Sequence, residues 1–195
     1  GRTAEELAAA LSAAYGADRT FSSPILAAVA LAGRLGWEFV PSLPFELAAV
    51  PHRWLRLLRA QVVSYGLPAL VAVGQLIEAR RPSGWPWRAV RQWARGPTLR
   101  KLEAIQPESG GYLEAVPLTS FVVLSLVAAH GGWGAEGITR ATVATPSSGG
   151  GARADAWRRV VERGLRFLEG SARPDGSWPI DVNLSVWVTT RAVEA

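Results

Sequence analysis

The chain has 195 residues, long enough for one domain with a hydrophobic core, and it contains neither cysteine nor methionine. The absence of cysteine excludes a disulfide framework and every cysteine-based metal site. The net charge of +5 rests almost wholly on arginine, which fits a nucleic-acid partner, an anionic membrane surface or the codon usage of a GC-rich genome.

Neither a metal site nor a membrane-spanning helix is expected. The two histidines, His52 and His130, lie far apart and belong to no metal-ligand motif, so we expect ordinary structural roles for both. No apolar run reaches the ~20 residues that a spanning helix needs, and no signal-peptide pattern opens the chain. The chain begins with Gly1 and ends at Ala195 within an apolar helical run, from which we expect a segment of a longer protein.

The N-terminal part predicts helices separated by proline-containing turns. Residues 5–15 and 25–35 are rich in alanine and leucine and predict two helices, with Ser22 or Ser23 capping the second. Residues 37–44 cannot form a regular helix, because two prolines lie three positions apart.

The most apolar window covers residues 62–77 and predicts a helix that Pro68 begins or kinks. Residues 78–97 are polar and basic and predict a loop, in which tryptophans alternate with arginines. The tryptophans are Trp85, Trp87 and Trp93, and the arginines are Arg80, Arg81, Arg88, Arg91 and Arg95.

The C-terminal half predicts a repeated unit in which an aromatic turn joins two helices. The first turn, residues 106–112, precedes an apolar helix at residues 117–129. The amphipathic residues 155–170 predict another helix, which leads into the second turn and an apolar stretch at 184–195. Residues 131–154 are rich in glycine, serine and threonine and predict a flexible loop between the repeats. No period-two alternation indicates a strand, so the fold class is predicted to be all-α.

The second turn resembles the repeat turn of the class II terpene cyclases, the squalene–hopene cyclase family. That repeat has a basic residue and glycine, an aromatic–aliphatic pair, a glutamine, and then Gly-x-Trp. The matching residues here are Arg163, Gly164, Phe167, Leu168, Gly176 and Trp178. Ala172 stands where the glutamine belongs; the first turn keeps Gln106 but has Tyr112 in place of the tryptophan.

A second stretch, residues 30–47, also resembles a segment of these cyclases that carries a tryptophan, Val-Pro and Pro-x-Glu before an apolar helix. The resemblance covers roughly residues 20–195 and implies an α/α toroid, of which this chain would form an incomplete part. We expect an N-terminal helical segment at residues 1–97 and two cyclase-type helix-pair repeats at 98–195, joined by the loop at 131–154.

The resemblance implies that the longer protein cyclises a linear triterpene such as squalene, for hopanoid or terpenoid biosynthesis, without a metal or organic cofactor. A strong carboxylic acid starts the carbocation cascade in that family, and it lies in an Asp-x-Asp-Asp motif that this chain lacks. We therefore assign no catalytic residue and expect the segment alone to be inactive. Asp181 and Glu114 are the nearest acids, and Asp181 is more readily interpreted as a helix cap.

Carbocations need aromatic faces and apolar walls around them. The candidates for the substrate cavity are Val116, Pro117 and Trp187, which follow the two turns. The alternative for Trp187 is an aromatic packed in the core between helices.

The family also suggests monotopic attachment to the cytoplasmic side of the inner membrane, where a lipid-like substrate enters directly. The candidates for membrane contact are Tyr65, Leu67, Leu70, Val71, Trp85, Trp87 and Trp93. The alternative is a core helix beside a solvated basic loop. No recognition motif supports nucleic-acid binding, and a homodimer is left open.

Two alternatives to the cyclase also remain. One is a non-catalytic α/α-toroid scaffold that binds a lipid or a protein. The other is a prenyltransferase-like toroid, which would need zinc ligands that this chain does not supply.

Overall fold

The computed structural model describes residues 6, 9–10, 13–14, 19–50, 66–132, 152–180 and 182. Within these ranges the regular structure is helical and no strand is present, so the all-α prediction is confirmed. The five α-helices are α2 (Arg19–Leu31), α4 (Leu67–Arg80), α5 (Trp87–Ala104), α6 (Val116–Leu126) and α8 (Ala152–Gly170). The short elements are η1 (Trp37–Phe39), η2 (Phe45–Ala49), η4 (Tyr112–Glu114) and the π-helix η5 (Val127–Gly131).

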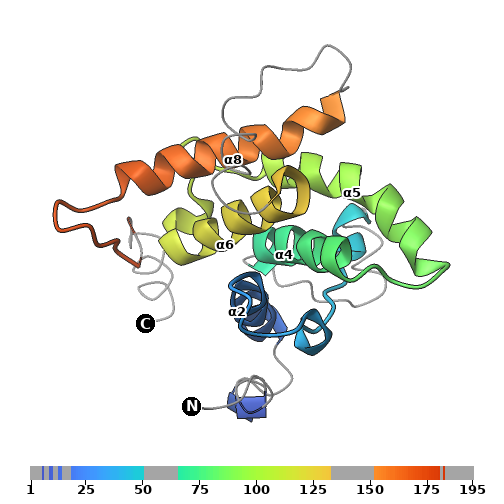
Figure 1. Ribbon diagram of the computed structural model, residues 1–195. Helices are drawn as coiled ribbons and strands as arrows, with labels where there is room; N and C mark the ends of the chain where they lie inside the picture. The colour runs from blue at the N-terminus through green and yellow to red at the C-terminus, as the bar shows by residue number, and fades with distance from the viewer. Residues whose placement is uncertain are drawn as a thin grey trace, which may run out of the picture.

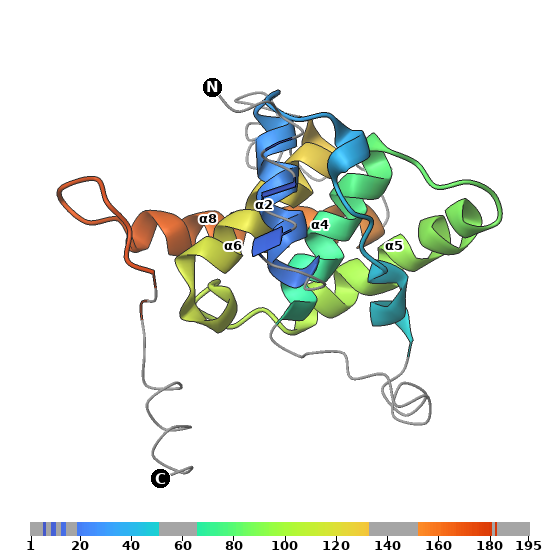
Figure 2. The ribbon, with the colours of Figure 1, turned by 90° about the horizontal axis from the view of Figure 1, so that it is seen from below.

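The helices pack in layers around α4 and α6, which lie against each other. Figure 1 shows α8 lying across α5 and α6 on one side of this pair, with α2 on the other side against α4. Seen from below, the turn after α8 projects at one end of the molecule and the turn between α4 and α5 projects at the other (Figure 2).

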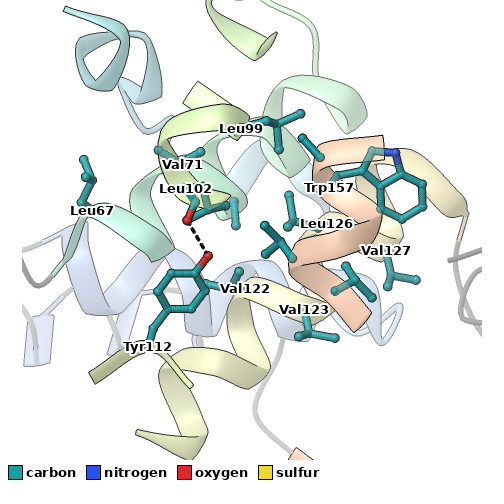
Figure 3. Close-up of a cluster of buried hydrophobic side chains, with 14 of the residues drawn as sticks. Leu67, Val71, Leu99, Leu102, Tyr112, Val122, Val123, Leu126, Val127 and Trp157 are labelled. Atoms are coloured by element: carbon teal, nitrogen blue, oxygen red, sulfur yellow. Dashed lines mark hydrogen bonds between the residues drawn. The ribbon is translucent and has the colours of Figure 1, made fainter. Parts of the chain in front are cut away.

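The described residues form two hydrophobic clusters, and α4 contributes to both. Figure 3 shows the larger cluster, where Val71 of α4 lies among side chains from α5, α6 and α8. Leu76 and Ile77 belong to the second cluster, with Leu26 of α2. A helix that is apolar on all sides is buried on most of them, and the sequence of α4 is of that kind. Among the described helices, none is long and apolar enough to cross a bilayer.

The predicted loop at residues 78–97 is wrong for most of its length. Helix α4 continues to Arg80, and α5 begins at Trp87 and passes through Pro97. Proline removes one backbone donor from a helix, but the neighbouring Ala94, Thr98 and Leu99 are buried. Packing of this face therefore outweighs the lost hydrogen bond.

The start of α2 also differs from its prediction. The helix begins at Arg19, so Ser22 and Ser23 lie inside it and do not cap it. Both serines are buried, and the Ser23 hydroxyl donates to the carbonyl of Pro41 at 3.4 Å. The predicted helices at 117–129 and 155–170 are observed as α6 with η5 and as α8.

The division predicted at residue 97 falls inside α5. The larger cluster joins Ala48 and Val71, on one side of that position, to Val122 and Val160 on the other. The two halves of the sequence thus share one core.

Candidate functional site

The first aromatic turn is tied to α8 by the side chain of Gln106. This buried amide donates from Nε2 to the carbonyl of Gly110 at 2.9 Å and to the carbonyl of Val160 in α8 at 3.1 Å. One side chain therefore closes the turn and holds it to a helix more than fifty residues away.

Tyr112 anchors the same turn to the end of α5. Its side chain is 2% exposed, and its hydroxyl donates to the carbonyl of Leu102 at 2.9 Å (Figure 3). Burial raises the pKa of the Tyr112 phenol, so the group remains a neutral donor. The Tyr112 amide donates to the Thr119 hydroxyl at 3.0 Å, and that hydroxyl donates to the carbonyl of Ala115.

Two glycines of this turn and one of α8 allow α8 to approach the turn and α6 closely. A Cβ at Gly110 would lie 2.2 Å from the carbonyl oxygen of Arg163, and one at Gly111 would lie 2.4 Å from the ring of Phe167. A Cβ at Gly164 would lie 2.6 Å from Val123 of α6. The Arg163 and Phe167 positions of the repeat are thus contact points between α8 and the preceding turn, and the Gly164 position is a contact point between α8 and α6.

The second turn repeats the internal geometry of the first. Trp178 Nε1 donates to the carbonyl of Leu168 at 2.7 Å, and both aromatic side chains bond a helix carbonyl ten residues earlier. Gly110 and Gly176 occupy the same place in the two turns and both have positive φ, +89° and +79°. Ala172 stands where Gln106 stands in the first turn, so the second turn has no side-chain amide that could bond to a neighbouring helix.

The chain segments that leave the two turns lie side by side. The Val116 amide donates to the carbonyl of Ile180 at 3.0 Å, and the Val182 amide donates to the carbonyl of Glu114 at 2.9 Å. Leu113 and Glu114 both have φ of 55°, a left-handed conformation that costs of order 1 kcal/mol or more per residue. The Ser109 hydroxyl donates to the Glu114 carboxylate at 2.6 Å, and this hydrogen bond helps to hold Glu114 in the left-handed conformation.

The predicted cavity residues fall at these exits. Val116 is buried at the start of α6, beside the second exit, whereas the adjacent Pro117 is exposed. Trp187 and Asp181 lie outside the described residues. Glu114 is partly exposed and bonded to Ser109. The lining of a substrate cavity by Val116, Pro117 and Trp187 remains a prediction.

The candidates for membrane contact divide into two groups. Leu67 and Val71 are buried in the larger cluster and Leu70 packs against it, which is the alternative of a core helix. Tyr65 lies outside the described residues. The tryptophans are exposed, Trp85 by 87%, Trp87 by 60% and Trp93 by 65%. We call Trp85, Trp87 and Trp93 the tryptophan patch. Val90, which lies between Trp87 and Trp93 in the sequence, is exposed as well.

Two of the arginines that precede the tryptophans in the sequence are exposed and also bond to backbone carbonyls of their own chain. Arg80 donates to the carbonyl of Ala128 at 3.3 Å. Arg81 donates to the carbonyls of Glu38 and Val40, each at 3.0 Å. The acceptors are neutral carbonyls, so both guanidinium groups keep their positive charge at the exposed surface.

The sequence analysis did not predict an ion cluster around Arg91, on the same helix as Trp87 and Trp93. Arg91 Nη1 donates to Glu78 at 2.9 Å and to the Ser83 hydroxyl at 2.7 Å, and Arg91 Nε lies 3.3 Å from Glu46 of η2. Burial by itself would raise the pKa of Glu78, but hydrogen bonds from Ser83 and Arg91 outweigh it, so the pKa is lowered. The sequence feature that could have indicated this cluster is an acid, Glu78, near the end of a mostly apolar helix.

A buried polar group around His130 was also missed. The Gln75 amide nitrogen donates to the Thr98 hydroxyl at 3.0 Å and to the Arg95 carbonyl, so its oxygen accepts from His130 Nε2 at 3.1 Å. The His130 ring stacks on Trp157 with centroids 5.5 Å apart. Burial, with a smaller contribution from Arg95, lowers the pKa of His130 to about 4, so the ring is neutral at pH 7.

No group of three or more potential metal ligands occurs among the described residues. Comparison with known proteins adds no assignment to these features: no family model matches the chain, and no curated protein and no solved structure gives a significant match.

Proposed function

We propose that the chain is part of a squalene–hopene-cyclase-like protein that converts a linear triterpene into a polycycle. The observation that carries the proposal is the shared geometry of the two turns. In each, an aromatic side chain bonds a helix carbonyl ten residues earlier, and the exits of the two turns are paired. Repetition of a helix followed by an aromatic turn supports the resemblance and an α/α toroid.

The proposed chemistry divides between this segment and the remainder of the protein. The first exit begins helix α6 with the buried, apolar Val116, which supplies part of the cavity wall in this proposal. The initiating acid comes from another part of the protein, because the chain contains no Asp-x-Asp-Asp motif. The segment provides shape and apolar surface for the cation, and protonation takes place elsewhere.

Incubation of the longer protein with squalene tests the cyclase proposal. We expect products with the mass of squalene but with rings in place of double bonds, detected by gas chromatography and mass spectrometry. The 195-residue chain alone serves as the matched control and should leave squalene unchanged. Squalene recovered unchanged from the longer protein would contradict the cyclase and, if it were also retained by the protein, would favour a lipid-binding scaffold.

We further propose that the tryptophan patch contacts the cytoplasmic face of the inner membrane as a peripheral attachment. The three exposed tryptophans belong to the turn between α4 and α5 and to the first turns of α5. This part of the chain projects at one end of the molecule (Figure 2). Exposed Arg88 follows Trp87 in the sequence and suits anionic headgroups. Indole rings favour the boundary between headgroups and acyl chains, because one part of the ring is apolar and the N–H is polar.

Flotation with liposomes that contain an anionic lipid tests this attachment. Replacement of Trp85, Trp87 and Trp93 by alanine should lower the bound fraction about tenfold or more, since three rings lose apolar contact. Trp178→Ala is the matched control, because this tryptophan is also exposed but belongs to the segment after α8. That segment projects at the opposite end of the molecule (Figure 2). Equal flotation of the triple variant and the unchanged chain would contradict the attachment.

A further inference from the structure

Ser83 lies in the turn between α4 and α5, at the centre of a set of hydrogen bonds. Its hydroxyl donates to the Glu78 carboxylate at 2.7 Å and accepts from Arg91 Nη1 at 2.7 Å. Its backbone amide donates to the other carboxylate oxygen of Glu78 at 3.0 Å. The turn that carries Trp85 is therefore joined to the end of α4 and to α5 through one serine.

The residues before Ser83 carry a charge pattern that protein kinases selective for basic substrates recognise. Arg80 and Arg81 stand three and two positions before it, and no other serine or threonine of the chain has arginine at both positions. Carboxylates in such a kinase bind the two guanidinium groups by charge-assisted hydrogen bonds. Ser22 and Thr98 have a single arginine, three positions before them, but they are only 4% and 0% exposed.

The turn that holds Ser83 is open to a second protein. Residues 82–84 belong to no helix, the residues on both sides of Ser83 are exposed, and Ser83 itself is partly exposed. The turn projects at one end of the molecule (Figure 2). No helix has to unwind before a kinase reaches the hydroxyl, and only its contacts with Glu78 and Arg91 must open.

We propose that Ser83 is a phosphorylation site and that its modification releases the turn and detaches the tryptophan patch from the membrane. In the transfer, Ser83 Oγ forms a bond to the γ-phosphorus of ATP, and the bond from that phosphorus to the leaving ADP breaks. The hydroxyl proton passes to a carboxylate of the kinase. The detachment rests on the membrane attachment proposed above, which places the turn on the cytoplasmic side, where ATP is present.

Phosphorylation changes the charge balance around Ser83. The ion cluster holds two carboxylates, those of Glu78 and Glu46, against the single guanidinium of Arg91. A phosphoserine adds a charge of about −1.5 to −2 at pH 7, and beside Glu78 this charge is repelled. The modified oxygen also has no proton to donate to Glu78. One arginine then faces three anionic groups, so the contacts that join the turn to both helices are lost.

The same phosphate acts on the membrane contact. Three exposed arginines, Arg80, Arg81 and Arg88, lie within five positions of Ser83 in the sequence. Basic residues near a membrane surface attract anionic lipids, and phosphorylation beside them reverses this attraction. The phosphate offsets most of their charge, so the indole rings lose the electrostatic part of the attachment.

Treatment of the 195-residue chain with ATP and a purified serine/threonine kinase selective for basic substrates tests the site. We expect one phosphate, located on Ser83 by mass spectrometry of peptides. Replacement of both Arg80 and Arg81 by glutamine should slow its incorporation at least about tenfold. Because both arginines also bond backbone carbonyls, a loosened turn alone would accelerate incorporation, so a slower rate reports recognition.

Ser109→Ala is the matched control for the site. Ser109 also lies on an exposed turn but has no arginine two or three positions before it, so this variant should take up phosphate as the unchanged chain does. A chain that takes up no phosphate, or takes it up only at other residues, would overturn the proposal.

Exchange and flotation test the effect of the phosphate on the same preparation. The Ser83 amide should exchange with deuterium at least about tenfold faster after phosphorylation, whereas the amides of residues 106–113 should not change. Flotation with anionic liposomes should fall about tenfold or more. Unchanged exchange at Ser83 overturns the release of the turn, and unchanged flotation overturns the detachment. Failure of the unmodified chain to float contradicts the membrane attachment alone, because phosphate uptake and exchange are measured without lipid.

Discussion

Single atoms decide how closely α8 approaches the first turn. Gly111 has φ of −92° and ψ of 119°, a conformation that any residue can adopt. The need for glycine at this position is therefore steric, since the Phe167 ring occupies the space that a Cβ would fill. Gly110, by contrast, combines a close neighbour with a positive φ.

Gly111→Ala should lower the free energy of unfolding by about 1–3 kcal/mol, the usual cost of overpacking. In a Phe167→Leu background the same change should cost less, because the clashing ring is gone. Gly170→Ala is the matched control: no described atom lies near its Cβ, and alanine in a helix is neutral or favourable. Urea denaturation measures the free energy of unfolding of each variant. If Gly111→Ala lowers this free energy equally in the unchanged protein and in the Phe167→Leu background, the contact between Gly111 and the Phe167 ring is refuted.

His130 should make the stability of the protein depend on pH. Its pKa is about 4 in the folded protein against 6.5 for an ordinary histidine, so protons bind preferentially to the unfolded chain. The contribution of His130 is therefore present above pH 6.5 and is lost as the pH falls toward 4.

Between pH 7 and pH 5, the unchanged protein should lose about 2 kcal/mol of stability relative to His130→Gln. Glutamine retains a donor for the Gln75 oxygen but does not titrate. Thermal or urea unfolding at both pH values gives the comparison. Parallel pH profiles for the two proteins would show that His130 is not held neutral by burial.

At the scale of the elements, Arg91 joins three of them. It lies on α5 and bonds Glu78 at the end of α4 and Glu46 in η2. All three charged side chains are largely shielded from solvent, so each depends on the others for compensation. This ion cluster connects the helix that carries the tryptophan patch to the core.

Arg91→Met should lower the free energy of unfolding by about 3–5 kcal/mol, since it leaves the Glu78 carboxylate buried without its cation. Adding Glu78→Gln should recover part of this loss, because the uncompensated charge is then removed. Arg88→Met, an exposed change on the same helix, should alter stability by no more than about 0.5 kcal/mol. A cost for Arg91→Met as small as that of Arg88→Met would contradict the role of the cluster.

At the scale of the whole molecule, two backbone hydrogen bonds join the exits of the turns. They connect the exit of the second turn to the beginning of α6, although the two segments are more than sixty residues apart. The pairing aligns the two exits, from which the proposed cavity would be built.

Val182→Pro removes the amide that donates to the carbonyl of Glu114 and should release the second exit from the first. Exchange of the Val116 amide, which donates to Ile180, should then become at least about tenfold faster. Ile180→Ala serves as the control, because it changes an exposed side chain and keeps its backbone carbonyl. Unchanged exchange at Val116 would mean that the pairing contributes little.

The aromatic turns could be predicted from the sequence because their main contacts are local. The bonds of Tyr112 to Leu102 and of Trp178 to Leu168 each span ten residues, so the aromatic turns could be found from their spacing. The amphipathic pattern of α8 likewise predicted its extent to within a few residues at its start. Pro97 was wrongly predicted to end a loop. The tendency of proline to interrupt helices is a local property, and it does not include the burial of the neighbouring residues that stabilises α5.

The sequence by itself therefore determined the all-α class, the aromatic turns and most of the helices in the second half, because their signals lie within one or two helical turns. Only the tertiary structure decided that α4 is buried in the core and that Arg91 compensates two acids, one of them 45 residues away. The pairing of the two exits was decided in the same way. These contacts join segments far apart in the chain, and they form only when the packed helices bring those segments together.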